Sequence, residues 1–334
     1  MSSMMLRRSL TTTVTTWTTL RCLSTTSTQL SHENPLGIPR RNPNPAPTMP
    51  RRGGPPVKRK IPGVKHVVVV SSGKGGVGKS TIAANLAVAL AQGQGKGVAG
   101  GRVGLLDLDI FGPSVPKLMG LEGVGEPLLS EGANKLIPMD NHGVKTMSMG
   151  YLLPPSANND SPVVWRGLMV MKAVQQLLFD VDWTSSAGDL EVLVIDMPPG
   201  TGDVQLSLGQ LVVVDGAVIV STPQDVALID ARKGVNMFRK IHIPIFGSIL
   251  NQSHFTCSCC STRHQLFGSP DAFKSVADDL SLDVLGEIPV VPVISSGGDS
   301  GVPVMVQDSK EGEETRQAMR GVARAMWKNL GRSI

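Results

Sequence analysis

Short apolar runs alternate with stretches of helical spacing along most of the chain. His66–Ser71 holds four consecutive valines, and the apolar segments that end at Asp107 and at Asp196 are also nearly unbroken. Such runs are typical of parallel strands that are buried on both faces. Thr81–Gln92 carries apolar residues at helical spacing without a breaker. The alternation predicts βαβ units and therefore an α/β fold, with a mostly parallel sheet flanked by helices.

The second half of the chain continues this alternation. A strand, an amphipathic helix and another strand are predicted over 216–253, and 281–294 is predicted to form a final strand. Near the C-terminus the apolar residues fall on one helical face, which we expect to pack on the core. That face consists of Met319, Val322, Ala323, Met326, Trp327 and Leu330. Ligands of parallel sheets bind beyond the carboxyl ends of the strands, so the side chains that follow the strands are the candidates for chemistry.

Charge is unevenly distributed along the chain. Residues 1–65 hold eleven Lys and Arg against one acidic residue, and the whole chain of 334 residues has 32 basic and 27 acidic residues. Subtraction leaves 21 basic and 26 acidic residues for 66–334, a net charge of −5. A nucleic-acid partner would need a basic patch on the folded domain, so none is predicted. The sequence also lacks the apolar run of about 18 to 20 residues that a membrane-spanning helix needs.

The first 30 residues have the composition of an organellar transit peptide. They are rich in Ser and Thr, carry Arg7, Arg8 and Arg21, and include no acidic residue. The arginines and the sequence RCLS, which resembles a matrix-protease cleavage site, favour the mitochondrial matrix over the chloroplast. A disordered Thr-rich tail is the alternative. We expect a Pro- and Arg-rich linker over 31–61 and one folded domain over 62–334.

The segment after the first predicted strand matches the phosphate-binding pattern G-x-x-x-x-G-K-[ST]. It reads GKGGVGKST and stands between a strand and a helix, the order that phosphate binding requires. Backbone N–H groups of such a loop surround the β-phosphate of ATP. Lys79 neutralises phosphate charge, and the Ser80 hydroxyl can bind Mg²⁺ at the positive end of the helix. The predicted nucleotide-binding residues of this P-loop are Gly73, Lys74, Gly75, Gly76, Val77, Gly78, Lys79, Ser80 and Thr81.

Carboxylates follow two further strands. Asp107 and Asp109 come after one strand, and Asp196 ends another, at the position of a Walker B residue that holds Mg²⁺ through water. Gly200 and Gly202 let the following loop approach the γ-phosphate. Phosphoryl transfer requires little covalent chemistry from protein groups, so positioned charges and water suffice. The sequence therefore predicts an ATP hydrolase that uses Mg²⁺.

The form of the P-loop adds a resemblance to one class of P-loop proteins. GKGGVGKST resembles the deviant Walker A box of the ParA, MinD and nitrogenase iron-protein class, in which the first lysine, here Lys74, reaches the nucleotide of a partner subunit. The resemblance implies dimerisation on ATP. It also implies that Asp109 positions the attacking water and that Asn251, at the expected end of a strand, contacts adenine. Lys74, Lys79, Asp109 and Asp196 are then the candidate catalytic residues.

Further motifs resemble the Mrp/Nbp-type P-loop ATPases, which carry iron-sulfur clusters. These are DLDIFGPSVPKLMG, PVVWRGLMVMKAV, DMPPGTGDVQLSL, STPQDVALIDARKG and a Cys-x-x-Cys after NQSHF, in the family's order from Pro62 to Ile334. The resemblance implies a 4Fe-4S cluster that bridges a homodimer and is delivered to iron-sulfur apoproteins. Together with the transit peptide, it points to mitochondrial members that serve assembly of respiratory complex I. Hydrolysis is expected to be slow, because a switch does not need rapid turnover.

Three of the four cysteines stand within four residues of one another. A 4Fe-4S cluster needs about four thiolates, and the segment is too short to surround one, so two chains that give two each are expected. Cys257 and Cys260 match the family's pair. Cys259 is predicted to be a bystander, because in an extended backbone its side chain points away from that of Cys260. Gln252 and Ser258 stand where the family usually has methionine and proline, and neither change removes a ligand.

A zinc site is the first alternative. It would use Cys257, Cys260 and His264, shared across a dimer, since thiolate sites often accept zinc. A reactive disulfide is disfavoured in a reducing matrix. His254 and His264 are each expected to be ordinary surface residues.

A membrane-recruited switch ATPase of the MinD type is the second alternative. Arg320, Arg324, Lys328 and Arg332 form a helical stripe beside the apolar face, which would suit peripheral attachment to a membrane. A solvated helix face explains the stripe equally well. An ATP-dependent scaffold that binds protein clients without metal is the third alternative. The Cys-x-x-Cys and the transit peptide favour the cluster carrier.

Overall fold

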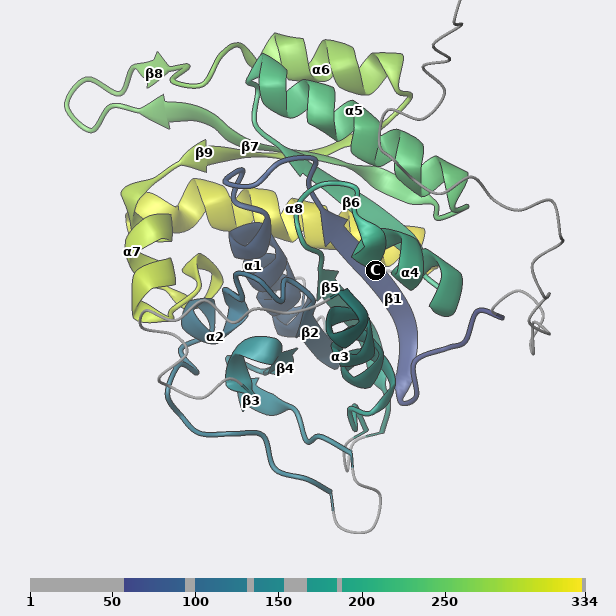
Figure 1. The fold of residues 1–334 in the computed structure, drawn as a ribbon. Coiled ribbons are helices and arrows are strands. Elements are labelled where there is room, and N and C mark those ends of the chain that lie inside the picture. The colour runs from purple at the N-terminus through teal and green to yellow at the C-terminus, as the bar shows by residue number, and fades with distance from the viewer. Residues whose placement is uncertain (1–56, 94–99, 131–134, 153–166, 185–187, 332–334) are drawn as a thin grey trace, which may run out of the picture. The chain divides into compact units, whose positions relative to one another are not determined.

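The computed structural model describes residues 57–93, 100–130, 135–152, 167–184 and 188–331. In these residues, nine strands form one sheet in the order β3, β4, β2, β5, β1, β6, β7 and β8, with β9 also paired to β7 (Figure 1). The strands are β1 Val64–Ser71, β2 Val103–Asp107, β3 Met139–Asn141, β4 Val144–Ser148, β5 Leu190–Asp196, β6 Gly216–Ser221, β7 Ile245–Thr256, β8 Arg263–His264 and β9 Val284–Val290. The α-helices are α1 Lys79–Gln92, α2 Val115–Leu118, α3 Gly167–Phe179, α4 Asp203–Leu211, α5 Asp225–Lys240, α6 Pro270–Asp279, α7 Pro292–Ser300 and α8 Glu313–Asn329.

The central strands are parallel and buried, which confirms the predicted fold class. β1 pairs in parallel with β5 on one side and with β6 on the other, and β5 pairs in parallel with β2. Val68, Val69 and Val70 of β1 are fully buried, as an unbroken apolar run predicts. Parallel strands end at the same edge of the sheet, so the loops that follow β1, β2 and β5 meet there.

Two pairs of helices pack on the sheet. Helices α1 and α8 contact each other, and α8 also contacts β9, whereas α5 and α6 lie side by side along β6 and β7 (Figure 1). The apolar face of α8 is buried, which confirms its predicted role in the core. Its buried residues include Met319, Val322, Ala323, Met326 and Trp327. Within the described ranges, no helix combines the length and the apolar character needed to cross a membrane.

Strand β7 runs past the end predicted for it at Asn251. The strand continues to Thr256, and Gln252 has a left-handed backbone with φ of 56°. Pairing of β7 with β9 shifts register between Asn251 and Phe255, the mark of a β-bulge. The bulge lets the strand continue toward the short antiparallel strand β8. The prediction that Asn251 ends this strand is therefore wrong.

Further strands differ from the sequence-based expectation, which also did not include β4 and β8. β9 ends at Val290, short of the predicted 294, because Pro292 begins α7, and proline is well suited to the first turn of a helix. At one edge of the sheet, β3 pairs antiparallel with β4. β3 has only three residues, too few for an apolar alternation, so the pattern of the sequence did not predict it.

The last residues of the predicted linker belong to the folded unit. The Arg59 backbone N–H donates to the Leu211 carbonyl at 2.8 Å, and the Val213 N–H donates to the Arg59 carbonyl at 3.0 Å. The Arg59 guanidinium lies 4.3 Å from the centroid of the Phe179 ring, a cation–π contact. Ile61 is 2% exposed. The predicted transit peptide, the linker up to residue 56, motif residues 162–166 and Arg332 lie outside the described residues.

Candidate functional site

The P-loop connects β1 to α1 at the carboxyl edge of the sheet. Gly76 and Gly78 have left-handed backbones with φ of 80° and 82°, which glycine adopts without strain, and Gly78 caps α1. At Gly73, an added Cβ atom would lie 2.1 Å from the backbone carbonyl carbon of Asp230 in α5. The loop is therefore pressed against α5 and curls over the N-terminus of α1, where backbone N–H groups favour phosphate.

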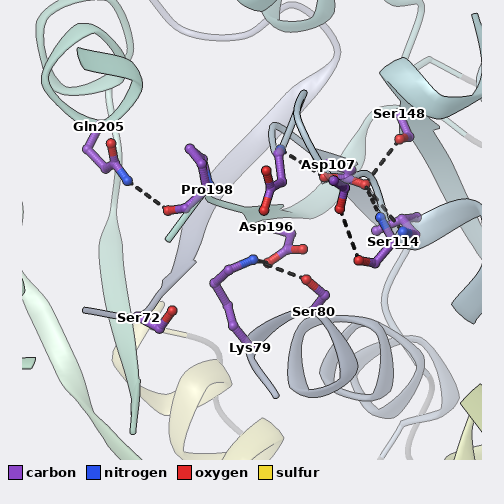
Figure 2. A network of polar contacts seen from close by, with 12 residues as sticks. Ser72, Lys79, Ser80, Asp107, Ser114, Ser148, Asp196, Pro198 and Gln205 are labelled. Atoms are coloured by element: carbon purple, nitrogen blue, oxygen red, sulfur yellow. Dashed lines mark hydrogen bonds and ion pairs between the residues drawn. The ribbon is translucent and has the colours of Figure 1, made fainter. Parts of the chain in front are cut away.

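Lys79 is buried at the start of α1, with 6% of its surface exposed. Its Nζ donates to Asp196 Oδ1 at 2.5 Å and to Ser80 Oγ at 3.1 Å (Figure 2). Burial raises the pKa of Asp196, and the Lys79 ammonium opposes that rise. In the described part of the chain, the second carboxylate oxygen, Asp196 Oδ2, is buried without a hydrogen-bond partner. An orphan carboxylate oxygen near the Ser80 hydroxyl fits a Mg²⁺ ion or its water ligands.

The loop after Asp196 is held by Gln205 of α4, a residue that the sequence motifs did not single out. Gln205 is 1% exposed, and its Nε2 donates to the carbonyl of Pro198 at 2.7 Å (Figure 2). The same nitrogen also donates to the carbonyl of Gly200 at 3.1 Å. The Gly200 N–H donates to the Ser72 carbonyl at 2.9 Å. The exposed Gly202 precedes α4 as its N-cap. These contacts hold the loop beside the P-loop, where its backbone can respond to a bound phosphate.

Asp107, at the end of β2, organises the loop that carries Asp109. Its Oδ1 accepts from the Asp109 N–H at 2.9 Å, and its Oδ2 accepts from the Ser148 hydroxyl at 3.1 Å and the Ser114 N–H at 3.2 Å (Figure 2). Burial, with a further contribution from the nearby Asp196 charge, raises the pKa of Asp107 to about 7. Burial also raises the pKa of Asp109, which is only half-buried. The carboxylate of Asp107 therefore fixes the backbone from which Asp109 projects.

The raised pKa of Asp107 predicts a pH-dependent stability. In an unfolded chain, aspartate titrates near its ordinary pKa of about 3.9, so between about pH 4 and pH 7 the Asp107 side chain is protonated to a larger extent in the folded protein than in the unfolded chain. The contribution of Asp107 to the free energy of unfolding should therefore fall as pH rises through this window, by up to about 1.4 kcal/mol per pH unit. Replacing Asp107 by asparagine should remove that part of the slope. Urea unfolding at several pH values within the window measures it.

The exposed Asp140 supplies a matched control for this experiment. The Asp140→Asn variant makes the same chemical change at an exposed position outside the network of Asp107, and it should keep the slope of the unmodified chain. Equal slopes in the Asp107→Asn variant and the unmodified chain would show that Asp107 stays ionised across the window.

Two cavities meet at the P-loop. One, of about 310 Å³, is lined mostly by the P-loop and also by Asp109 and Pro199. The other, of about 480 Å³, shares Gly78 and Thr81 with the first and extends past Asn251 toward the end of β9. The first cavity combines cationic and N–H donors, which suits phosphate groups, and the second is large enough for a nucleoside. The cavities and the orphan oxygen of Asp196 together fit ATP with Mg²⁺.

Asn251 contacts the P-loop directly. Its Nδ2 donates to the Val77 carbonyl at 2.7 Å, and a Cβ atom added at Gly78 would lie 2.3 Å from that nitrogen. Asn251 is 8% exposed and lines the larger cavity. An adenine contact by Asn251 stays a prediction, but the side chain already links β7 to the loop that would hold the phosphates.

Lys74 differs from the other predicted catalytic residues in its surroundings. Its side chain is exposed, and within the described ranges it makes no hydrogen bond or ion pair. It lines the smaller cavity with Lys79 and Asp109. The structure thus brings the predicted nucleotide-binding residues together at one edge of the sheet, and it leaves Lys74 at the surface.

The cysteine pair lies on a hairpin formed by β7, the turn 257–262 and β8, here called the cysteine hairpin (Figure 1). The Cys257 N–H donates to the Thr262 carbonyl, and the Ser261 N–H donates to the Cys257 carbonyl, both at 2.9 Å. Cys257 is half-buried, whereas Cys259 and Cys260 are exposed. Hydrogen bonding, chiefly with Thr262, lowers the pKa of Cys260 and so favours the thiolate that binds metal.

The turn corrects one argument made from the sequence. The prediction that Cys259 is a bystander assumed an extended backbone, but residues 258–260 form a turn, so alternation of side chains does not apply. The expectation for His254 is also wrong, because His254 is buried, at 9% exposed. His264 is exposed in β8, as expected. Within the described residues of one chain, no three His, Cys, Asp or Glu side chains are grouped to hold a metal ion, so the zinc set with His264 is not assembled there.

A known protein family matches most of the chain. Residues 63–327 match the sequence model of the ParA-type family described as the NUBPL iron-transfer P-loop NTPases. The chain belongs to this family. The NUBPL iron-transfer family is a branch of nucleotide-hydrolysing P-loop proteins, in agreement with the β1, P-loop and α1 arrangement.

Relatives of this NUBPL-family chain are found in animals, plants and archaea. The mouse protein named iron-sulfur cluster transfer protein NUBPL is 48% identical over 277 residues, 83% of this chain and 81% of its own length. An Arabidopsis thaliana protein named iron-sulfur protein required for NADH dehydrogenase, mitochondrial, is 45% identical over 278 residues and 83% of each chain. A solved nucleotide-binding protein from Archaeoglobus fulgidus in complex with ADP is 34% identical, with a TM-score of 0.61 over 76% of this chain and 93% of its own.

Proposed function

We propose that this chain is an ATP-dependent carrier that binds a 4Fe-4S cluster and delivers it to mitochondrial apoproteins, chiefly subunits of respiratory complex I. The observation that carries the proposal is the course of β7. The strand contacts the P-loop through Asn251 and reaches the cysteine pair six residues later, at Cys257. One strand thus joins a nucleotide site to a pair of metal-binding thiols. The names of the mouse and Arabidopsis relatives support the cargo and the recipient.

The cluster, as cargo, calls for two copies of the chain. A 4Fe-4S cluster takes about four thiolates, and each cysteine hairpin offers the pair Cys257 and Cys260, so a homodimer completes the ligand set. The exposure of the hairpin supports this arrangement, because two hairpins can approach without unfolding the domain. Lys74, exposed beside the smaller cavity, is available to reach the nucleotide of the partner.

Each residue of the nucleotide site has a separate role in ATP hydrolysis. Lys79 and the N–H groups of the P-loop bind the phosphates, and Ser80 and Asp196 would hold Mg²⁺, which supplies charge stabilisation when bound. Asp109, on the loop fixed by Asp107, orients the attacking water. A bound phosphate must compete with Asp196 for the Lys79 ammonium. When Asp196 loses this partner, the conformation of the loop that follows it, with Gly200 and Gly202, changes. Slow, switch-like hydrolysis would then alter the dimer interface and cluster release.

The predicted transit peptide and the mitochondrial relative support action in the mitochondrial matrix. Attachment to a membrane in the manner of MinD receives less support. The apolar face of α8, which an interfacial helix would insert into lipid, is buried against the domain. Any membrane association of the chain is then peripheral, through the basic stripe, and no nucleic-acid partner is proposed.

Iron and acid-labile sulfide in the full chain, reconstituted without oxygen, test the proposed function. About four irons and four sulfides per two chains, in a species with the mass of a dimer, are expected. The same sample should pass its cluster to an apoprotein that takes a 4Fe-4S cluster, such as apo-aconitase. Tight zinc, or no metal at all, would contradict the carrier and favour a metal-free ATP-dependent scaffold.

A further inference from the structure

One carboxylate contacts both strands of the cysteine hairpin. Arg263 Nη2, in β8, donates to Glu314 Oε1 at 3.1 Å, and His254 Nε2, in β7, lies 3.5 Å from the same oxygen. His254 stands three residues before Cys257, and Arg263 stands three residues after Cys260. Glu314, in the first turn of α8, therefore meets the hairpin at its base, on either side of the cysteine pair.

The first turn of α8 is itself held firmly. Arg316 is 6% exposed, and its guanidinium donates to the backbone carbonyls of Gln307 and Ser309 and to the Glu313 carboxylate. A buried guanidinium that is shared among several acceptors keeps a fixed orientation. Glu314 thus projects from a fixed platform, and its acidic side chain at a helix N-terminus is favoured by the helix dipole.

A contact at Nδ1 orients the buried imidazole of His254 so that Nε2 faces Glu314. The Ser253 hydroxyl donates its hydrogen to the Ile288 carbonyl at 3.2 Å, so it accepts from His254 Nδ1, 3.0 Å away. This contact fixes the ring. Because Nδ1 donates to Ser253, Nε2 can donate to the Glu314 carboxylate only in a ring that carries a proton on both nitrogens, the imidazolium. Among the described residues, Nε2 is buried with no hydrogen-bond partner, and Glu314 Oε1 is the charged atom that faces it, 3.5 Å away.

Beyond Phe255, which also pairs with Val290 of β9, the cysteine hairpin has few other supports among the described residues. Both residues of β8 are exposed, and β8 pairs with β7 only at Phe255 and Thr256. Hydrogen bonds within the turn close it but do not attach it to the domain. A surface segment with so few contacts opens locally at a low cost in free energy. Even one weak ion pair therefore increases the fraction of molecules in which the segment is closed.

We propose that Glu314 is a positioning residue, which clasps β7 and β8 and so holds Cys257 and Cys260 at a fixed place for the cluster. This inference rests on the proposed carrier function and deepens it. The neighbouring residue, Thr315, is buried and lines the 480 Å³ cavity together with Asn251. The clasp and the nucleotide site thus share one turn of α8.

Amide hydrogen exchange of residues 255–264 in the full, cluster-free chain tests the clasp. The Glu314→Gln variant should exchange about fivefold faster in this segment, the effect expected for loss of a partly exposed ion pair. Arg263→Gln should do the same, and Arg263→Lys, which keeps the charge, should retain most of the protection. Glu311→Gln is the matched control, because Glu311 is exposed on the segment before α8. In loaded protein, Glu314→Gln should shorten the half-life of the cluster severalfold.

The outcomes separate this inference from the function on which it rests. Loading of the unmodified chain tests the carrier, and if it holds no cluster, the carrier and the positioning role both fail. If the unmodified chain holds a cluster, unchanged exchange in Glu314→Gln and Arg263→Gln overturns the clasp. Faster exchange with unchanged cluster half-life overturns the positioning role. Should Glu314→Gln fail to fold, Arg263→Gln decides, since Arg263 is 66% exposed.

Discussion

Replacing Lys79 by alanine is expected to weaken ATP binding about a hundredfold or more, because the phosphates lose a buried, charge-assisted donor. The same change should destabilise the protein. Lys79 Nζ lies 2.5 Å from the fully buried Asp196, and removing one partner of a buried pair costs roughly 3–5 kcal/mol. Isothermal titration with ATP and thermal unfolding measure the two effects separately.

Two further variants separate binding from folding in this experiment. The double variant Lys79→Ala with Asp196→Asn removes both charges, so it should recover most of the stability and none of the ATP affinity. Lys74→Ala changes an exposed lysine of the same loop, and it should fold normally and bind ATP while losing hydrolysis in the dimer. Tight ATP binding by a folded Lys79→Ala variant would contradict the assigned role of the P-loop.

Serine in place of Cys257 or Cys260 is expected to remove essentially all of the iron and sulfide from the reconstituted chain. A dimer that is missing two of its four thiolates cannot enclose the cluster. The hydroxyl of serine preserves the size of the side chain, so the hydrogen bonds of the turn at Thr262 and Ser261 should persist. Iron and sulfide analysis with the visible absorption spectrum measures the loss, and circular dichroism checks the fold.

Cys259→Ser is the matched control, since Cys259 is an exposed cysteine of the same turn. It should keep about four irons per dimer. Loss of iron in this variant with retention in Cys257→Ser or Cys260→Ser would reassign the ligand pair. ATP affinity should be unchanged in all three variants, because none of these cysteines lines either cavity at the P-loop.

The sequence predicted those parts of the fold whose signals are local. The valine run of β1, the glycine spacing of the P-loop and the apolar face of α8 each depend on residues close together in the chain, and all three are found where expected. The course of β7 was misjudged because the bulge at Gln252 breaks the two-residue alternation. The side of the strand on which His254 lies could not be read from the pattern.

The site was predicted as a set of residues, but not as a network. Asn251 and Val77 are 174 positions apart, and Asp107 and Ser148 are 41 apart, so no spacing in the sequence reveals either hydrogen bond. Gln205 follows the Walker B motif closely, yet its role depends on burial of its amide against the loop carbonyls. The importance of a polar side chain for the site is therefore better judged from the loop atoms to which it hydrogen-bonds than from its distance to a motif along the sequence.

The backbone hydrogen bonds and the cation–π contact of Arg59 limit how far the chain can be shortened from its N-terminus. Expression from Pro62, where the motif resemblance begins, would leave the Leu211 carbonyl and the Val213 N–H without their partners and would uncover the Phe179 ring. Affinity tags and fluorescent fusions are better attached before residue 57, and a protease site for their removal belongs there as well. A boundary placed at Pro62 would remove the isolated β-bridge between Arg59 and Val212.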